Sequence, residues 1–348
     1  MYKPVHGGDI YSEQNKGSGK NLVDYSANVN PLGLPASVKD AIKNSIKNCV
    51  NYPDPLCREL TEKLARHLNV KKEQLFISNG AADVLFKLAL ALKPRRAVLL
   101  APTFADYEKA LQTVDCKFTY YDLQEENNFV AENDLLKKIN SRVDLVVICN
   151  PNNPTGNDLL RSEIEKILCQ FEGLVMLDEA YNDFSKAPSF LEELDKYPNL
   201  VVFQTFSKAW GCAAIRLGMA FASKEIIDIL SKIKYPYNVN QLTQQQAIAM
   251  LHKHYEIERW VKTLKEERDY LEAEFEKLPC TIKLFPSDAN FFLAKVTDAV
   301  KIYNYLVGEG IIVRNRHNIS LCCNCLRVTV GTRVENNTLL ATLKKYPG

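Results

Sequence analysis

Three polar motifs, each directly after an apolar run, carry residue types that can do amine chemistry. Asn153 follows DLVVI in the motif CNPNNPTG, and Asp178 and Tyr181 end the run LVMLDEAY. Lys208 follows NLVVFQTF, and Arg216 comes eight residues later. A buried lysine near other cations loses its proton readily and can then attack aldehydes. A carboxylate buried at a strand end requires a positive partner, such as a protonated pyridine nitrogen.

These requirements are met together by pyridoxal 5'-phosphate, which carries an aldehyde, a pyridine ring and a phosphate. We expect Lys208 to form a Schiff base with the aldehyde and Asp178 to bind the ring nitrogen, which keeps the ring electron-poor. Asn153 and Tyr181 are expected to hydrogen-bond the phenolate oxygen of the ring. Taken singly, the motifs also fit a surface lysine, a helix cap and a turn. Their joint occurrence at successive strand ends favours the cofactor site.

A helix start is expected to hold the cofactor phosphate, because the N–H groups at a helix N-terminus bind anions. The turn SNGAAD leads from the run LFI into a helical pattern and offers the N–H groups of Ala81 and Ala82. Side chains around the lysine complete this cradle: Thr205, Ser207 and Arg216. Tyr107, in APTFADY after the run AVLL, is expected to stack on the ring face.

The elements that must position these residues alternate between strand and helix patterns from about residue 70 to 225. This alternation predicts an α/β fold with a mostly parallel sheet covered by helices on both faces, which binds ligands beyond the carboxyl ends of its strands. A long helical stretch follows at about 240–278, and then a small α+β pattern. We expect an N-terminal arm with part of the small domain at 1–35, a large cofactor-binding domain at 36–250 and a small domain at 251–348.

The composition limits the classes of partner. The 348 residues include 44 basic and 42 acidic side chains, for a formal charge of +2, so neither nucleic acid nor a membrane surface is expected as a partner. The N-terminal sequence lacks the apolar core of a signal peptide, and no run approaches the roughly 20 apolar residues of a membrane span. We expect a cytoplasmic enzyme that acts on small molecules.

Ten cysteines are scattered along the chain and are expected to be reduced thiols of the core. Cys322, Cys323 and Cys325 form a cluster that could be drawn as a metal site with His317. The cluster lacks the paired CxxC spacing typical of zinc ligands, and a thiol-rich strand edge explains it as well. We therefore predict no metal.

The motifs NPNNPTG, DEAY and TFSKAWGCAAIRLG resemble those of the fold-type-I aminotransferases, and the resemblance covers nearly the whole chain. Within that class, DEAYNDF, SKAWG, KIKYPYNVN, GIIVRNR and CLRVTVGT are similar to the histidinol-phosphate aminotransferase family. The resemblance implies the fold-type-I architecture, a large domain with a mostly parallel sheet flanked by helices plus a small α+β domain. It also implies that Arg327 holds a substrate carboxylate, or that of glutamate, and that Arg314 helps it to hold the phosphate of histidinol phosphate. Tyr52, in NYPDP, would reach the cofactor phosphate of the neighbouring subunit in a homodimer.

The first third of the chain resembles a sister group, the threonine-phosphate decarboxylases of cobalamin synthesis. The similar segments are VHGGDIYS, DYSANVNPLGLP and APTFADYEKAL. Asn28 begins the segment Asn-Val-Asn-Pro, where the aminotransferases more usually have Asn-Glu-Asn-Pro, and we count it among the substrate-binding residues. His6 lies in an arm that either closes over the substrate phosphate or is flexible and without a role.

The resemblance favours transamination of L-histidinol phosphate with 2-oxoglutarate, which gives imidazole acetol phosphate and glutamate in histidine biosynthesis. The alternative is decarboxylation of threonine phosphate or serine phosphate at the same site, in cobalamin biosynthesis. A third class, a regulatory protein that kept the fold without catalysis, finds no support, because the sequence shows no additional DNA-binding domain and its net charge is small.

Overall fold

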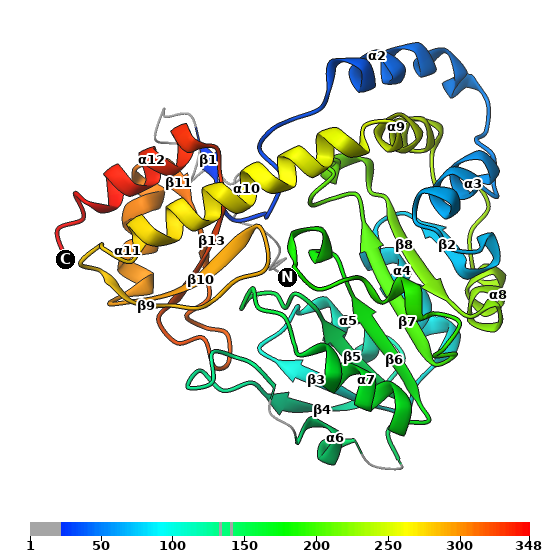
Figure 1. The fold of residues 1–348 in the computed structure, drawn as a ribbon, viewed down its shortest axis with the longest axis horizontal. Coiled ribbons are helices and arrows are strands. Elements are labelled where there is room, and N and C mark those ends of the chain that lie inside the picture. Colours follow the sequence, from blue (N-terminus) through cyan, green and yellow to red (C-terminus); the bar gives the residue numbers. More distant parts are fainter. Residues whose placement is uncertain (1–21, 132–133, 140–141) are drawn as a thin grey trace.

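The computed structural model describes residues 22–131, 134–139 and 142–348. Three sheets and the helices around them make up this part of the chain (Figure 1). No helix in the described ranges is long and apolar enough to cross a membrane. His6 and the arm around it lie outside the described residues.

The large sheet has seven strands in the order β2-β8-β7-β6-β5-β3-β4. All neighbouring strands are parallel except at β8, which is antiparallel to β7 and to the edge strand β2. The expected mostly parallel sheet is therefore confirmed. The strands are β2 (Leu75–Ser78), β3 (Arg96–Ala101), β4 (Lys117–Asp122), β5 (Leu145–Cys149), β6 (Leu174–Asp178), β7 (Leu200–Thr205) and β8 (Gly218–Ala222).

Helices cover both faces of this sheet, which is why a central strand such as β5 is apolar at every position. In β5, Val146 and Ile148 belong to one buried cluster, and Leu145 and Val147 belong to another. The second cluster lies under α4 (Ala81–Leu92), α5 (Asp106–Gln112) and α8 (Lys224–Lys232). The first lies under α3 (Arg58–His67) and α7 (Arg161–Gln170). Side chains alternate between the faces of a strand, so a sheet covered on both sides reads as a continuous apolar run.

The small sheet is antiparallel, with the strand order β12-β13-β10-β9. Its strands are β9 (Thr281–Leu284), β10 (Phe291–Val296), β12 (Arg314–Asn315) and β13 (Cys325–Thr329). Near it, α11 (Ala299–Gly308) and α12 (Arg333–Leu343) share a buried cluster with Tyr25. The short strand β1 (Val23–Asp24) pairs in parallel with β11 (Ile311–Ile312), so the start of the described chain lies against the C-terminal part. The division of the chain at residues 35 and 250 stays a prediction.

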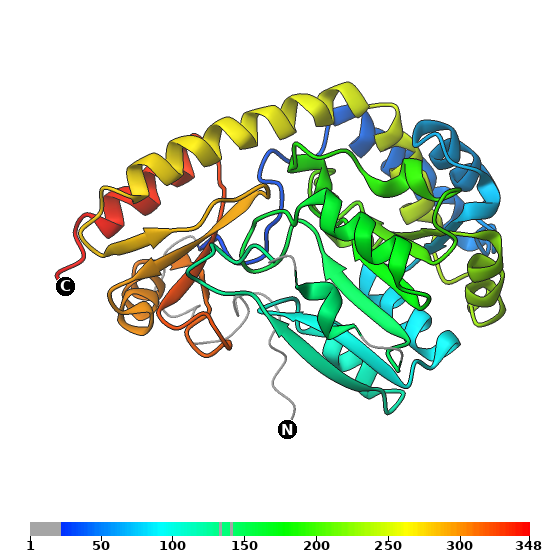
Figure 2. The ribbon, with the colours of Figure 1, turned by 60° about the horizontal axis from the view of Figure 1, so that its bottom comes forward.

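The long connecting helix expected at about 240–278 is two helices. α9 (Gln241–Leu251) ends at His252, and α10 (His254–Phe275) begins after Lys253. The two helices have different neighbours: α9 packs on α2 (Ala36–Ser45) and α3, whereas α10 packs on α12 and β10. Figure 2 shows α10 running along one side of the molecule from the large sheet to the small one. One straight helix could not make both sets of contacts.

Shorter elements complete the fold. The helix α6 (Leu135–Lys138) follows β4, and five 3₁₀ helices lie in the connections of the described chain. These are η1 (Ile46–Val50), η2 (Lys72–Gln74), η3 (Asn182–Phe184), η4 (Phe190–Glu193) and η5 (Ala213–Ile215).

The backbone of β8 packs directly on the start of α4 at Gly218, where a Cβ atom would lie 2.1 Å from the nitrogen of Ala81. We predict that Gly218→Ala lowers the free energy of unfolding by about 1–3 kcal/mol, because the methyl group forces the two backbones apart. Urea unfolding of the cofactor-free protein measures the change. The control is Gly308→Ala in α11, where nothing lies within 4 Å and helix propensity favours alanine. Equal stability of Gly218→Ala and the parent would contradict the close approach.

Candidate active site

The carboxyl ends of β5, β6 and β7 bring the three polar motifs to one edge of the large sheet. Asp178 is the last residue of β6, and the segments after β5 and β7 carry Asn153 and Lys208. Parallel neighbours end on the same side of a sheet, so residues distant in sequence meet there. The small sheet closes this edge from the other side, because Arg327 of β13 donates a hydrogen bond from Nη1 to Asn153 Oδ1 at 2.6 Å.

Lys208 points into this edge and is partly buried. Its Nζ donates a hydrogen bond to the carbonyl of Ala27 at 3.0 Å and lies 5.4 Å from the centre of the Tyr181 ring. Burial, followed by the positive charges of Arg327 and Arg216, lowers the pKa of Lys208 to about 7. The amine is therefore largely uncharged just above neutral pH, which is the form that attacks a carbonyl carbon.

Asp178 is a buried carboxyl group held by two donors. The Tyr107 hydroxyl donates to one oxygen at 2.6 Å, and the N–H of Ala180 donates to the other at 3.0 Å. Burial nevertheless raises the pKa of Asp178, although these donors and the charge of Lys208 act against it. A further positive partner at this carboxylate would lower the cost of its burial.

Tyr107 does not present its ring for stacking, although we expected it to. Its ring is 1% exposed and its hydroxyl is used by Asp178, so the ring face is not open to a ligand. The partly buried ring of Phe104, which directly follows Pro102 and Thr103 at the end of β3, meets Tyr107 edge-on at 5.5 Å. Tyr107 was expected to stack because APTFADY follows the apolar run AVLL. Distance from the strand end was the better signal, and it points to Phe104.

A cradle for an anion forms where α4 begins. Gly80 precedes the helix with a φ of +99°, a conformation open to glycine, and a Cβ atom there would lie 2.7 Å from Nη2 of Arg216. The guanidinium of Arg216 therefore lies against the turn, next to the first helical residues, Ala81 and Ala82. The first N–H groups of a helix lack partners within the helix, so they and the guanidinium present donors on the same side.

The hydroxyl groups after β7 lie next to this cradle. The Thr205 hydroxyl lies 2.9 Å from both the Ser207 hydroxyl and the carbonyl of Leu217. Nη1 of Arg216 is 3.5 Å from Ser207 Oγ, at the limit of a hydrogen bond. The structure thus brings together all five residues expected to hold the phosphate: Ala81, Ala82, Thr205, Ser207 and Arg216.

The segment from Ser26 to Asn30 runs through the site and joins it to the small sheet. Ser26 accepts a hydrogen bond from Arg327 through its carbonyl, as Ala27 does from Lys208. Asn28 donates from Nδ2 to the Tyr181 hydroxyl at 3.1 Å, and Asn30 donates to the carbonyl of Ala209 at 2.8 Å. Sequence reasoning singled out Asn28 but missed the backbone carbonyls, because carbonyl positions leave no mark on residue type.

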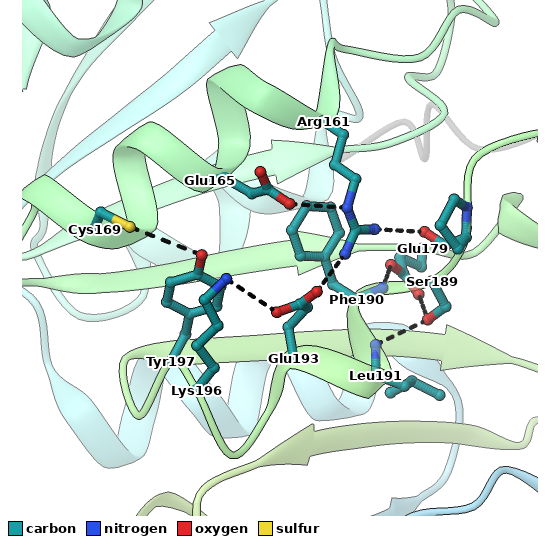
Figure 3. Close-up of polar contacts among 11 residues, drawn as sticks. Arg161, Glu165, Cys169, Glu179, Ser189, Phe190, Leu191, Glu193, Lys196 and Tyr197 are labelled. Carbon is teal, nitrogen blue, oxygen red and sulfur yellow. Dashed lines mark hydrogen bonds and ion pairs between the residues drawn. The ribbon is translucent and has the colours of Figure 1, made fainter.

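The residue after Asp178 fixes the end of β6 from behind. The buried carboxylate of Glu179 accepts hydrogen bonds from the N–H of Phe190 at 2.8 Å and from Gln204 at 3.1 Å. Arg161 lies over the Phe190 ring at 4.1 Å and pairs with Glu193 at 2.8 Å, as Figure 3 shows. Because Gln204 lies on β7, this network ties the end of β6, where Asp178 lies, to the strand that precedes Lys208.

Three further features were singled out in the sequence: Tyr52, His6 and the cluster of cysteines near His317. Tyr52 is 81% exposed, and its ring stacks on that of Tyr237 at 4.5 Å, away from the Lys208 contacts described above. His6 lies outside the described residues. No group of three or more His, Cys, Asp or Glu side chains in the described ranges could hold a metal ion, and the ring of His317 faces Asn324.

Comparison with known proteins agrees with this geometry. Residues 20–343 match the family of class I and II aminotransferases, and the chain belongs to it. A histidinol-phosphate aminotransferase of Bacteroides thetaiotaomicron is 65% identical over 325 residues, which cover 92% of this chain and 90% of the relative.

Solved structures share the fold. That of a histidinol-phosphate aminotransferase from Clostridium acetobutylicum has a TM-score of 0.87 at 29% identity and covers 93% of this chain and 98% of that one. The structure of an L-threonine-O-3-phosphate decarboxylase from Porphyromonas gingivalis has a TM-score of 0.84 at 23% identity. It covers 92% of this chain and 98% of that one. The decarboxylase shows that the same fold occurs in an enzyme of the alternative class.

The lowered pKa of Lys208 gives a prediction about pH. The cofactor-free protein should acquire a visible absorption band with pyridoxal 5'-phosphate at a rate that rises with pH and is half-maximal near pH 7, because only the uncharged amine attacks the aldehyde. Rapid-mixing absorption between pH 5.5 and 9 measures this rate. The control is a free lysine derivative, whose amine has an ordinary pKa of about 10.4 and should show no such midpoint. A protein midpoint near that of the derivative would refute the proposed environment.

Proposed function

We propose that this chain catalyses the pyridoxal-phosphate-dependent transamination of L-histidinol phosphate with 2-oxoglutarate. The observation that supports this proposal most strongly is the Lys208 amine, whose pKa is about 7. It lies near the buried carboxyl group of Asp178 and near the guanidinium of Arg327. The identity of 65% to a histidinol-phosphate aminotransferase supports the choice of substrate. The products are imidazole acetol phosphate and glutamate.

The described residues fit the cofactor. The carboxyl group of Asp178 has a raised pKa because its burial is incompletely compensated, and a protonated pyridine nitrogen would supply the missing positive charge. The Gly80 turn leaves room for the Arg216 guanidinium where a side chain would collide with it. When bound, the cofactor supplies an aldehyde for amine exchange and a ring that accepts electrons.

Lys208 is the residue that moves the proton. With the cofactor bound, the Lys208 amine would act as the general base that accepts the proton from the substrate carbon bearing the nitrogen, and then as the general acid that gives it back. Asp178 would hold the ring nitrogen and favour its protonated form. Asn153 and Tyr181 would hold the ring oxygen, and Asn28 positions the Tyr181 hydroxyl by its hydrogen bond of 3.1 Å.

The arginines of the small sheet select the substrates. Arg327 holds the carboxylate of glutamate or 2-oxoglutarate, and with Arg314 it holds the phosphate of histidinol phosphate. A planar guanidinium bonds two oxygen atoms at once, so it suits both anions. The two arginines would therefore fix the orientation of the substrate at the Lys208 amine. That Asn28 and His6 bind the substrate stays a prediction.

The active enzyme in this proposal is a homodimer. Large apolar side chains around Tyr52 are exposed in the single chain, among them Val50 at 86% and Leu56 at 59%. Monomeric proteins seldom leave so many large apolar groups together in water, so a second copy of the chain is the fitting cover. Tyr52 would then reach the cofactor phosphate in the neighbouring subunit.

The compartment in this proposal is the cytoplasm. All ten cysteines are free thiols, and seven of them are buried. Free thiols persist in a reducing compartment, and they would be at risk of oxidation elsewhere.

The test is to mix the cofactor-loaded protein with histidinol phosphate and follow the visible band. We expect the band to be lost and to return when 2-oxoglutarate is added, with glutamate formed in equal amount. Lys208→Ala should show neither the band nor turnover. The control Lys224→Ala, an exposed residue at the start of α8, should keep both.

The same protein is then mixed with threonine phosphate while carbon dioxide is measured. The proposal predicts no release. Release of carbon dioxide from threonine phosphate, with no exchange between histidinol phosphate and 2-oxoglutarate, would identify a decarboxylase and overturn the proposed function.

A further inference from the structure

Arg316 lies next to the two arginines of the small sheet, Arg314 and Arg327. Arg314 of β12 is directly opposite Arg327 of β13, and the N–H of Arg316 continues this ladder by donating to the carbonyl of Cys325 at 2.9 Å. Directly opposed residues and residues two apart share one face of a sheet. Three guanidinium groups therefore project from the same face of the small sheet.

The surroundings of Arg316 do not compensate its charge. Its Nε is buried without a hydrogen-bond partner, as is Nε of Arg327, and no carboxylate of the described chain pairs with either guanidinium within 4 Å. Burial, followed by the positive charges of Arg327 and Arg314, lowers the pKa of Arg316, and the nearby Cys322 and Tyr181 only partly oppose this effect. Like charges that face each other across a ladder destabilise it, so the sheet carries an electrostatic cost.

A bound anion of high charge removes this cost. A phosphate monoester carries a charge of roughly −1.5 to −2 and three acceptor oxygens, whereas one guanidinium already matches both oxygens of a carboxylate. Arg327 is drawn toward the Lys208 edge by Asn153 at 2.6 Å and is 4% exposed. Arg316 is two positions further along the chain than Arg314, just past the end of β12, and retains partial exposure.

We propose that Arg316 binds the phosphate of the amine substrate directly and makes the site selective for phosphorylated amines. The proposal rests on the proposed function in one respect, that the amine substrate carries a phosphate monoester. Arg316 forms no part of the cofactor site, and it acts on binding of the phosphorylated substrate more than on the proton transfer at Lys208. Its removal should therefore affect the two half-reactions unequally.

The experiment compares the cofactor-loaded parent with Arg316→Gln, Arg316→Lys and the control Arg66→Gln, an exposed arginine of α3. For Arg316→Gln we expect KM for histidinol phosphate to rise about 10- to 100-fold, because one charge-assisted hydrogen bond to the phosphate is lost. The value of kcat should change less than about 3-fold. KM for glutamate should change far less than KM for histidinol phosphate. Arg316→Lys should recover part of the loss, and Arg66→Gln should match the parent.

A second readout needs no turnover. Inorganic phosphate is titrated into each cofactor-loaded protein, whose cofactor-phosphate cradle is already filled, and the midpoint of thermal unfolding is recorded. Phosphate should raise the midpoint of the parent and of Arg66→Gln, and should do so for Arg316→Gln only at about 10-fold higher concentration or more.

The outcomes separate this inference from the proposed function. If the parent fails to exchange histidinol phosphate with 2-oxoglutarate, the proposed function fails, while the phosphate titration still decides the role of Arg316. Equal phosphate affinity in the parent and Arg316→Gln would overturn the inference, whatever the substrate proves to be. Equal loss of kcat in both half-reactions, with a lowered unfolding midpoint before phosphate is added, would make Arg316 a structural residue and would also overturn it.

Discussion

Burial of a carboxyl group and an amine at neighbouring strand ends is the constraint on which the rest of this structure depends. Burial raises the pKa of Asp178 and lowers that of Lys208, so it drives both groups toward their uncharged forms. The surroundings of the two groups favour different protonation states: the charged form of the Asp178 carboxyl group and the uncharged form of the Lys208 amine. Tyr107 and the N–H of Ala180 favour the charged carboxylate, and Arg327 adds to the loss of the lysine proton. One site thus joins a carboxyl group whose donors favour its charged form to an amine that loses its proton near neutral pH.

The two sheets must keep a fixed relation for this arrangement to work, and two parts of the chain provide it. The Ser26–Asn30 segment bonds both to the Lys208 loop and to Arg327 of the small sheet. The helix α10 runs from one sheet to the other (Figure 1). Behind the site, Glu179 ties β6 to β7 through Gln204. The small sheet then adds positive charge to an edge that must receive substrates with carboxylate and phosphate groups.

Much of this could be read from the sequence, for physical reasons. Parallel strands covered on both faces are continuously apolar, so their ends and the polar residues there, such as Asp178, stand out. What failed depended on three-dimensional contacts. Tyr107 turned inward to Asp178, and the break before α10 reflects different packing partners. Arg316 was overlooked although Arg-Asn-Arg already had the two-residue period of a shared strand face, because its lack of a partner is visible only after folding.

The most direct test of the account is the rate at which Asp178→Asn, loaded with cofactor, loses its visible band with saturating histidinol phosphate. Asparagine has nearly the shape of aspartate but carries no charge, so it cannot hold a positive charge on the ring nitrogen. The account predicts that the variant still binds the cofactor through Lys208 but reacts about 100- to 1000-fold more slowly than the parent in rapid-mixing absorption. A rate close to that of the parent would contradict the central role given to the buried carboxylate.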